Sequence, residues 1–154
     1  MRVNPEYADG WTGLGSIYAD LKCFDDAIEA YREAVRINPE QASAWCGLGL
    51  AYYKLKRYDE ALNVFREALR IDPEYTPAWT LLGIAYGKLK RYNDASEAYR
   101  EVVRIKPNDA KAWYNLGVAY FLSGNKTSAM DTVRELRPLD AEQADKLFNR
   151  IMSR

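Results

Sequence analysis

The four tryptophans of this 154-residue chain recur at one constant interval, and this repeat period constrains the fold more than any other feature. They are Trp11, Trp45, Trp79 and Trp113. The stretch AWCGLGLAYYKLKRYDEA at residues 44–61 also returns, barely altered, as AWTLLGIAYGKLKRYNDA at 78–95. Self-similarity at such a period is typical of stacked supersecondary units, each of which buries its apolar face against the next. The sequence therefore predicts an array of repeats that forms one domain over residues 1–154.

Each repeat carries two apolar stripes at helical spacing. The first stripe has steps of 3, 1 and 3 residues and reads, in the second repeat, Trp45, Leu48, Gly49 and Tyr52. The second stripe has steps of 4 and 3 residues and reads, in the same repeat, Ala61, Phe65 and Ala68. Steps of this size place side chains on one face of an α-helix. Each repeat is therefore predicted to be a helical hairpin.

The residues between the stripes mark the ends of these helices. A short polar turn, Leu55–Tyr58 in the second repeat, separates the two helices of a hairpin. Proline disfavours helical geometry at the residue before it, and it follows the second stripe at Pro39, Pro73 and Pro107. The repeats are therefore predicted at 8–41, 42–75, 76–109 and 110–143.

The motif W-x2-L-G-x2-Y, followed by A-x3-[FY]-x2-A and then proline, resembles that of the tetratricopeptide repeat (TPR) family. The resemblance covers four repeats and nearly the whole chain. It implies an all-α fold, an α-solenoid in which four helix-turn-helix hairpins form a right-handed superhelix with a concave groove.

The fourth repeat departs from the motif, which indicates that the array ends there. Val133, Leu136 and Ala141 stand where the other repeats have an aromatic residue, a small residue and proline. Asp140, with Gln143 three residues later, is a candidate N-cap. It would begin a capping helix at about 140–153 whose apolar face consists of Ala144, Leu147, Phe148 and Ile151.

The other end of the chain begins with RVNPE at 2–6, which nearly copies RINPE at 36–40. Residues 1–7 are therefore interpreted as the remnant of a preceding repeat, in either an excised fragment or a natural start. The first helix would then expose a face that fits a preceding helix, and an exposed apolar patch favours self-association. Concentration-dependent dimerisation through the N-terminal end is predicted.

The composition argues against catalysis, metal binding and nucleic-acid binding. Histidine, the commonest general base, is absent, and Cys23 and Cys46 have no metal-ligand or disulfide spacing. Basic and acidic residues number 22 each, so no global field attracts nucleic acid or a charged membrane. No apolar run has the length of a membrane span. The chain is predicted to be a soluble protein, cytoplasmic in location, without a cofactor and not an enzyme.

A further stripe on each first helix lies about 100° around the helix from the tryptophan. By the family resemblance this stripe and its neighbours line the concave groove. The predicted groove residues are Cys46, Leu50, Tyr53, Lys54, Thr80, Ile84, Lys88, Lys111, Tyr114, Asn115, Val118 and Phe121. Apolar and aromatic side chains facing water, rimmed by lysines, indicate a recognition surface. The alternative is that contacts between neighbouring first helices bury Leu50, Ile84 and Val118.

Some members of the family bind a partner's C-terminal carboxylate with lysine, asparagine and arginine side chains in the groove. Only Lys111 and Asn115 match residues expected in such a clamp, because the equivalent places in earlier repeats hold residues such as Thr12, Cys46 and Ile84. An extended or helical segment with apolar anchors is the better prediction.

The predicted function is that of a scaffold or adaptor that binds a protein or peptide partner in the groove. Two alternatives stay open: a self-associating structural module, and a docking segment of a larger protein that carries its catalysis elsewhere. The basic turns, Lys54–Arg57 and Lys88–Arg91, are interpreted as solvated, or else as a weak attraction for an acidic partner.

Overall fold

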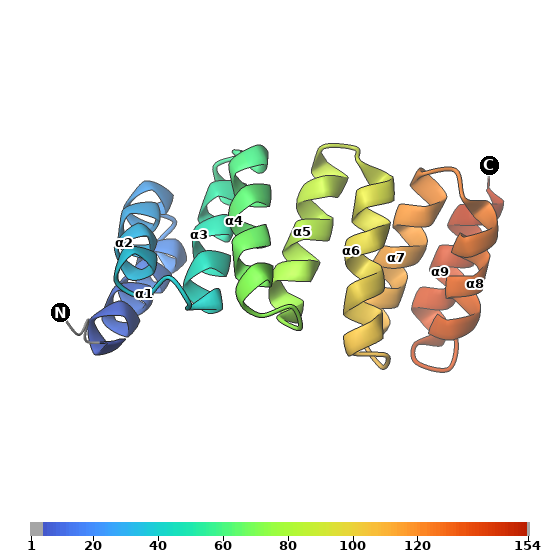
Figure 1. Cartoon of the computed structure of the whole chain (residues 1–154). Coiled ribbons are helices and arrows are strands. Elements are labelled where there is room, and N and C mark those ends of the chain that lie inside the picture. Colours follow the sequence, from blue (N-terminus) through green and yellow to red (C-terminus); the bar gives the residue numbers. More distant parts are fainter. Residues whose placement is uncertain (1–4, 154) are drawn as a thin grey trace. The chain divides into compact units, whose positions relative to one another are not determined.

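Figure 1 shows the computed structural model of the chain, which describes residues 5–153. These residues form α-helices joined by short turns, and no strand occurs among them. The helices are α1 (Pro5–Asp20), α2 (Phe24–Ile37), α3 (Ala42–Lys54), α4 (Tyr58–Ile71), α5 (Thr76–Lys88), α6 (Tyr92–Ile105), α7 (Ala110–Leu122), α8 (Lys126–Leu136) and α9 (Ala141–Met152). The predicted remnant at 1–7 falls mostly outside the described residues, and α1 already begins at Pro5.

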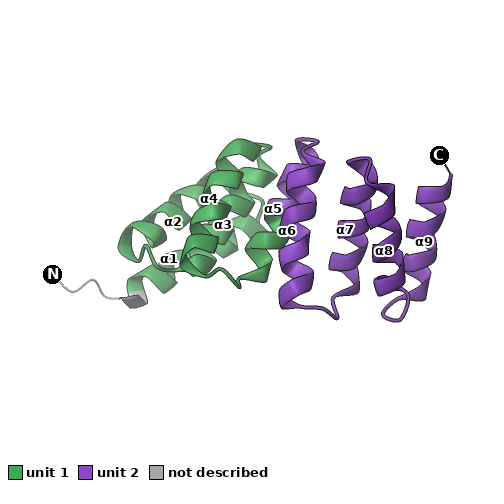
Figure 2. Cartoon of the chain, turned by 45° about the vertical axis from the view of Figure 1, so that its right-hand side comes forward, with its two compact units in different colours: residues 1–81 green, residues 82–154 purple. Residues whose placement is uncertain are grey.

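The chain divides into two compact units, Met1–Leu81 and Leu82–Arg154 (Figure 2). In the first unit α1 packs against α2, α2 against α3, and α3 against α4. In the second unit α6 packs against α7, α7 against α8, and α9 against both α7 and α8. The pairs α1–α2, α3–α4 and α7–α8 thus correspond to three of the predicted hairpins, while the grouping of all repeats into a single domain stays a prediction.

The connections between hairpins end the second helices where proline was expected to end them. Helices α2, α4 and α6 each stop at an isoleucine, just before the residue that precedes proline. In three repeats the tryptophan indole N–H donates to the backbone carbonyl oxygen of that proline. The pairs are Trp45 to Pro39 at 2.8 Å, Trp79 to Pro73 at 2.8 Å and Trp113 to Pro107 at 2.7 Å. The tryptophan therefore fastens the start of each hairpin to the connection that precedes it.

The turns within the hairpins each contain one residue in the left-handed region of the backbone. Lys22, Lys56 and Lys90 have φ of 61°, 62° and 58°, and Gly124 has φ of 87° in the fourth repeat. Such a residue after the last helical turn lets backbone N–H groups reach the final carbonyls of the helix. The N–H of Arg57, for example, donates to the carbonyl of Tyr52 at 3.0 Å.

Glycine in the first helix lies directly against a large side chain of the second. A Cβ added at Gly49 would come within 2.5 Å of the Phe65 ring, and one at Gly83 within 2.8 Å of the Tyr99 ring. In the fourth repeat Val133 replaces the aromatic residue, and Leu147 of α9 instead lies against Gly117. The capping helix therefore supplies the bulk that the smaller valine lacks.

Helix α9 begins and packs as predicted. Asp140 Oδ1 accepts from the backbone N–H of Gln143 at 3.0 Å, and the Gln143 side chain returns a bond to Asp140 Oδ2 at 2.7 Å. One face of α9 joins α8 in a core cluster of fully or almost fully buried residues. The cluster consists of Ala129, Val133, Leu136, Ala144, Leu147 and Ile151.

This cap makes the second unit sensitive to acid. The backbone hydrogen bond from Gln143, aided by its side chain, lowers the pKa of Asp140 below its ordinary value. Stabilisation by a carboxylate with a depressed folded-state pKa is present above the unfolded pKa and is lost as pH falls through the folded value. We therefore expect the Asp140 contribution to be complete at pH 7 and to decline as the pH falls below about 4.

Asp140→Asn provides the matched control, because asparagine also caps helices but does not titrate. Urea midpoints of both proteins, measured between pH 7 and pH values below about 4, should converge as the carboxylate protonates. A constant difference between the two midpoints across that range would contradict this role of Asp140.

Candidate functional site

The predicted groove residues of the first unit lie along α3 and at the start of α5. Leu50, Tyr53 and Thr80 are half-buried, and Lys54 is exposed. The Tyr53 ring packs against the ring of Tyr58 at the start of α4, with centroids 5.5 Å apart and planes inclined by 54°. Tyr53 therefore covers the turn of its own hairpin and still exposes part of its side chain.

Cys46 belongs to the core of the first unit. Its side chain is only 6% exposed, and burial raises the pKa of the thiol to about 12. At neutral pH the group is a protonated thiol without nucleophilic character. It therefore offers a groove ligand very little surface.

The second unit contains a cavity of about 280 Å³ between α5, α6 and α7. Four predicted residues line it: Ile84 and Lys88 from α5, and Asn115 and Val118 from α7. The remaining lining was not predicted and consists of Gly83, Gly87, Tyr92, Ala95, Tyr99, Ala119 and Leu122. The repeat period predicted lining residues on α5 and α7. The lining that α6 contributes depends on how this helix packs against them.

Gly87 explains why this cavity exists. It stands one repeat period after Tyr53, and Tyr92 stands one repeat period after Tyr58. In the earlier repeat the two tyrosine rings pack together, whereas a Cβ added at Gly87 would meet no atom within 4 Å. The missing ring leaves open space beside Tyr92, and this replacement within the period was the available sequence signal for the cavity.

Three predicted residues of α7 lie near the capping helix. Tyr114, Val118 and Phe121 are half-buried and pack against the cluster that α8 and α9 form. They are partly covered but not sealed, so each retains some surface. Lys111, at the start of α7, is exposed.

The arginines of the basic turns are engaged within the chain. Arg57 lies over the Tyr52 ring with its Cζ 4.7 Å from the centroid, and its Nε donates to Glu60 at 2.9 Å. Arg91 lies over the Tyr86 ring at the same 4.7 Å and its Nε donates to Asp94 at 2.7 Å. These arginines are exposed but already engaged within the chain, and the lysines of the same turns, Lys54, Lys56, Lys88 and Lys90, are exposed as well.

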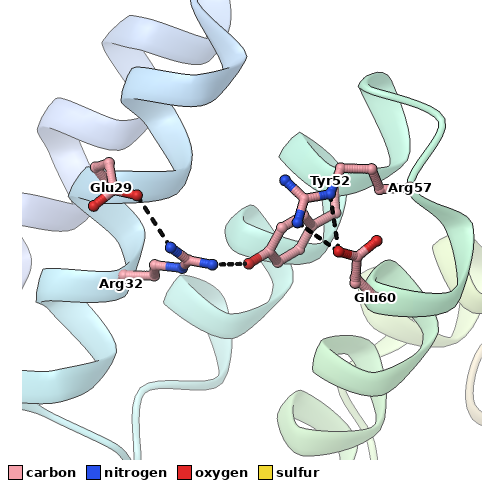
Figure 3. Close-up of polar contacts among 5 residues, drawn as sticks. All are labelled: Glu29, Arg32, Tyr52, Arg57 and Glu60. Atoms are coloured by element: carbon pink, nitrogen blue, oxygen red, sulfur yellow. Dashed lines mark hydrogen bonds and ion pairs between the residues drawn. The ribbon is translucent and has the colours of Figure 1, made fainter.

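Figure 3 shows how the first of these arginines joins a network across two hairpins. From α2, Arg32 donates to Glu29 at 3.1 Å and to the Tyr52 hydroxyl at 2.8 Å. From the other side, Arg57 stacks on the same ring and bonds to Glu60, which lowers the pKa of that carboxyl. The tyrosine thus connects α2 with α3 and α4.

Metal sites need particular side-chain clusters, and membrane-spanning segments need long apolar helices. Residues 5–153 contain no group of three or more histidine, cysteine, aspartate or glutamate side chains arranged to hold a metal ion. Within the same range every helix is too short or too polar to cross a membrane.

Comparison with solved structures confirms the fold. A crystal structure of MamA superposes with a TM-score of 0.81 and 26% identity, over 92% of this chain and 77% of that one. The first TPR of Spaghetti (RPAP3), bound to the HSP90 peptide SRMEEVD, gives 0.74 and 24% over 77% and 94%. YrrB, a TPR protein with an unusual peptide-binding site, gives 0.79 and 20% over 97% and 87%. The chain is therefore an all-α helical-repeat solenoid, as predicted.

Comparison of the sequence with curated proteins gave no match. A family model does match, over residues 5–152, and it describes the C-terminal domain of cilia and flagella-associated protein 70. This model is a TPR model, which agrees with the tryptophan period, the hairpins and the glycine contacts described above. The chain therefore belongs to the TPR family of the cilia and flagella-associated protein 70 C-terminal domain.

Proposed function

We propose that the chain is a non-catalytic scaffold that binds a peptide or helical segment of a partner protein on the surface of α5 and α7. The cavity beside Gly87 carries this proposal, because it places apolar walls, an asparagine amide and a lysine in one recess. Recesses with apolar walls and a few convergent polar groups are the usual anchors of bound segments. TPR proteins are in general interaction modules.

The chemistry of the recess favours an apolar anchor with a nearby acceptor group. Ile84, Val118 and Leu122 offer apolar contact, and Leu122 is 36% exposed although it is a large apolar residue. Asn115 can donate to or accept from the partner's backbone, and Lys88 can pair with an acidic side chain. A leucine or phenylalanine of the partner, flanked by an acidic residue, would match these groups.

Two structural neighbours bind peptides, which supports a peptide partner at the level of the shared fold. The RPAP3 domain is bound to an HSP90 peptide, and YrrB has a peptide-binding site described as unusual. The carboxylate clamp of some TPR proteins is not expected here. Only Lys111 and Asn115 match its residues, and the other clamp positions hold uncharged side chains. We therefore propose an apolar side chain of the partner as the anchor.

Substitution of Gly87 by tyrosine tests the proposal. The new ring should pack on Tyr92 as Tyr53 packs on Tyr58, and so fill the recess from within. We expect peptides selected on the wild-type chain from a phage-displayed random library to bind with Kd on the order of 1 μM. Isothermal titration should show at least a tenfold loss on Gly87→Tyr.

Gly87→Ala is the matched control, because its Cβ meets no atom within 4 Å and should leave the recess open. Circular dichroism melts verify that both variants fold. Equal affinity of the selected peptides for Gly87→Tyr and Gly87→Ala would place their binding site elsewhere and overturn the proposal.

The exposed face of α1 favours a second function, self-association. Tyr7 and Leu21 are each 67% exposed and Trp11 is 37% exposed, at spacings that place them on one side of α1 and of the turn that follows it. Tyr7, Trp11 and Leu14 also line a recess of about 220 Å³. An apolar face of this kind fits the same face of a second copy.

Sedimentation equilibrium tests self-association. We expect the weight-average mass to rise with concentration into the high micromolar range and Tyr7→Lys to abolish the rise, since a lysine would have to be desolvated in the contact. Met152→Lys is the control, because Met152 is 55% exposed on α9, away from α1 in the sequence. A monomeric wild-type chain throughout, or equal loss in both variants, would refute it.

A further inference from the structure

An arginine stacked on a tyrosine recurs in the middle repeats. Tyr52 carries Arg57 and Tyr86 carries Arg91, with 4.7 Å between guanidinium carbon and ring centroid in both pairs. The two tyrosines are one repeat period apart, as are the two arginines. Covered in this way, Tyr52 is 6% exposed and Tyr86 is 7% exposed. The tyrosine at this repeat position therefore favours a stacked guanidinium group.

The fourth repeat keeps the tyrosine and lacks the arginine. Tyr120 lies one repeat period after Tyr86, and Asn125 lies one repeat period after Arg91. The Asn125 side chain is committed to the cap of α8, where its Oδ1 accepts from the Ser128 backbone N–H at 3.0 Å. Tyr120 is accordingly half-buried rather than buried.

A cavity of about 450 Å³ stands at this place, between α6, α7 and α8. Its aromatic and apolar lining includes Trp113, Leu116 and Tyr120. It is separate from the recess beside Gly87, with which it shares no lining residue. The cavity therefore lies beside Tyr120, the tyrosine of the repeat that lacks the recurring arginine.

One carboxylate in the cavity lining is available to pair with a cation. The cavity lining includes the carboxylates Glu101, Asp131 and Glu135 and the guanidinium groups of Arg100 and Arg104. Exposed ion pairs engage two of the carboxylates: Arg104 with Glu101 at 2.8 Å, and Arg134 with Asp131 at 3.1 Å. The Glu135 side chain makes no ion pair or hydrogen bond with any of residues 5–153.

Arg100 lies two repeat periods after Arg32, so the contacts of Arg32 indicate which part of Tyr120 Arg100 corresponds to. Arg32 bonds to the Tyr52 hydroxyl and its guanidinium carbon lies 6.0 Å from the ring centroid, while Arg57 takes the stacking place at 4.7 Å. Arg100 therefore corresponds to the group at the hydroxyl. The stacking place on Tyr120 has no counterpart of Arg57 within the described residues.

We propose that this cavity binds an arginine side chain of a partner protein, with the guanidinium on the Tyr120 ring and a bond to Glu135. In the second repeat Glu60 holds the stacked guanidinium, and its equivalent here is Ser128, so the carboxylate has to come from elsewhere on α8. Arginine fits better than lysine because its planar group both stacks and bonds to a carboxylate in two places. The site is independent of the scaffold function proposed for α5 and α7.

The probe is the acetylated and amidated tripeptide Gly-Arg-Gly, compared with the same peptide carrying citrulline, which has arginine's shape without its charge. Titration of the full chain should be followed by amide and indole NMR signals. We expect saturable shifts at Trp113, Tyr120 and Glu135, with Kd on the order of 1 mM for one anchored side chain. Citrulline should bind at least tenfold more weakly.

Variants of Asn125 test whether the absence of a stacked arginine on Tyr120 is what allows binding. Asn125→Arg should place the chain's own guanidinium on Tyr120 and abolish the shifts, whereas Asn125→Ala loses the same cap without filling the space and should still bind. Tyr120→Phe should retain binding because it keeps the ring, and Tyr120→Leu should lose it.

Three results would overturn the proposal: no saturable shift with the arginine peptide, equal binding of citrulline, or equal loss in Asn125→Arg and Asn125→Ala. Self-association that Asn125→Arg suppresses and Asn125→Ala does not would assign the cavity to a second copy, and would also overturn it. Because none of these variants touches Gly87 or α5, failure here leaves the peptide-binding result at α5 and α7 unaffected.

Discussion

Leu147→Ala is expected to lower the free energy of unfolding of the second unit by about 2 to 5 kcal/mol. Leu147 is fully buried at the centre of the cluster that α8 and α9 build, and it also covers Gly117 of α7. Removing its isobutyl group takes contacts from three helices at once. The residual space cannot collapse readily, because Leu136 and Ile151 beside it are themselves fully buried.

Urea unfolding followed by circular dichroism and by tryptophan fluorescence measures this effect. Met152→Ala is the matched control, since that side chain belongs to the same helix but is 55% exposed. We expect the control to change the unfolding free energy by less than about 0.5 kcal/mol. If the two alanine variants unfold at the same urea concentration, α9 does not act as the buried cap of the array.

Gly49→Ala is expected to destabilise the first unit by about 1 to 3 kcal/mol, although alanine is the better helix former. The new Cβ would lie 2.5 Å from the Phe65 ring and 2.9 Å from a methyl of Val64. Phe65 is fully buried, so neither its ring nor the backbone of α4 can move aside without displacing other core residues. Overpacking therefore outweighs the gain in helix propensity.

Gly13→Ala is the control for this substitution. Gly13 also lies in a first helix, but a Cβ there meets no atom within 4 Å. Its replacement should raise the unfolding free energy by about 0.5 to 1 kcal/mol through helix propensity alone. Opposite signs for the two variants in thermal and urea unfolding would confirm the packing role of Gly49, and equal signs would refute it.

The α5 and α7 surface illustrates how the repeat period both finds and misses a site. It identified Ile84, Lys88, Asn115 and Val118, because residues that share a helix face can be counted along the sequence. The same period predicted Cys46 as a groove residue, but that side chain is buried. Equivalent residues in successive repeats lie on the same face of their helices but contact different side chains. The repeat period alone therefore cannot assign solvent exposure.

Local chemistry was enough to predict the helical hairpins, the ends of the second helices ahead of Pro39, Pro73 and Pro107, and the capped helix that begins after Asp140. Helical spacing, proline and a capping carboxylate each act within a few residues of the chain, and for that reason they are legible in the sequence. Cavities, in contrast, do not depend on local sequence alone. The recess beside Gly87 and the cavity at Tyr120 exist because side chains from three helices fail to fill a volume between them, and that sum depends on how distant segments pack.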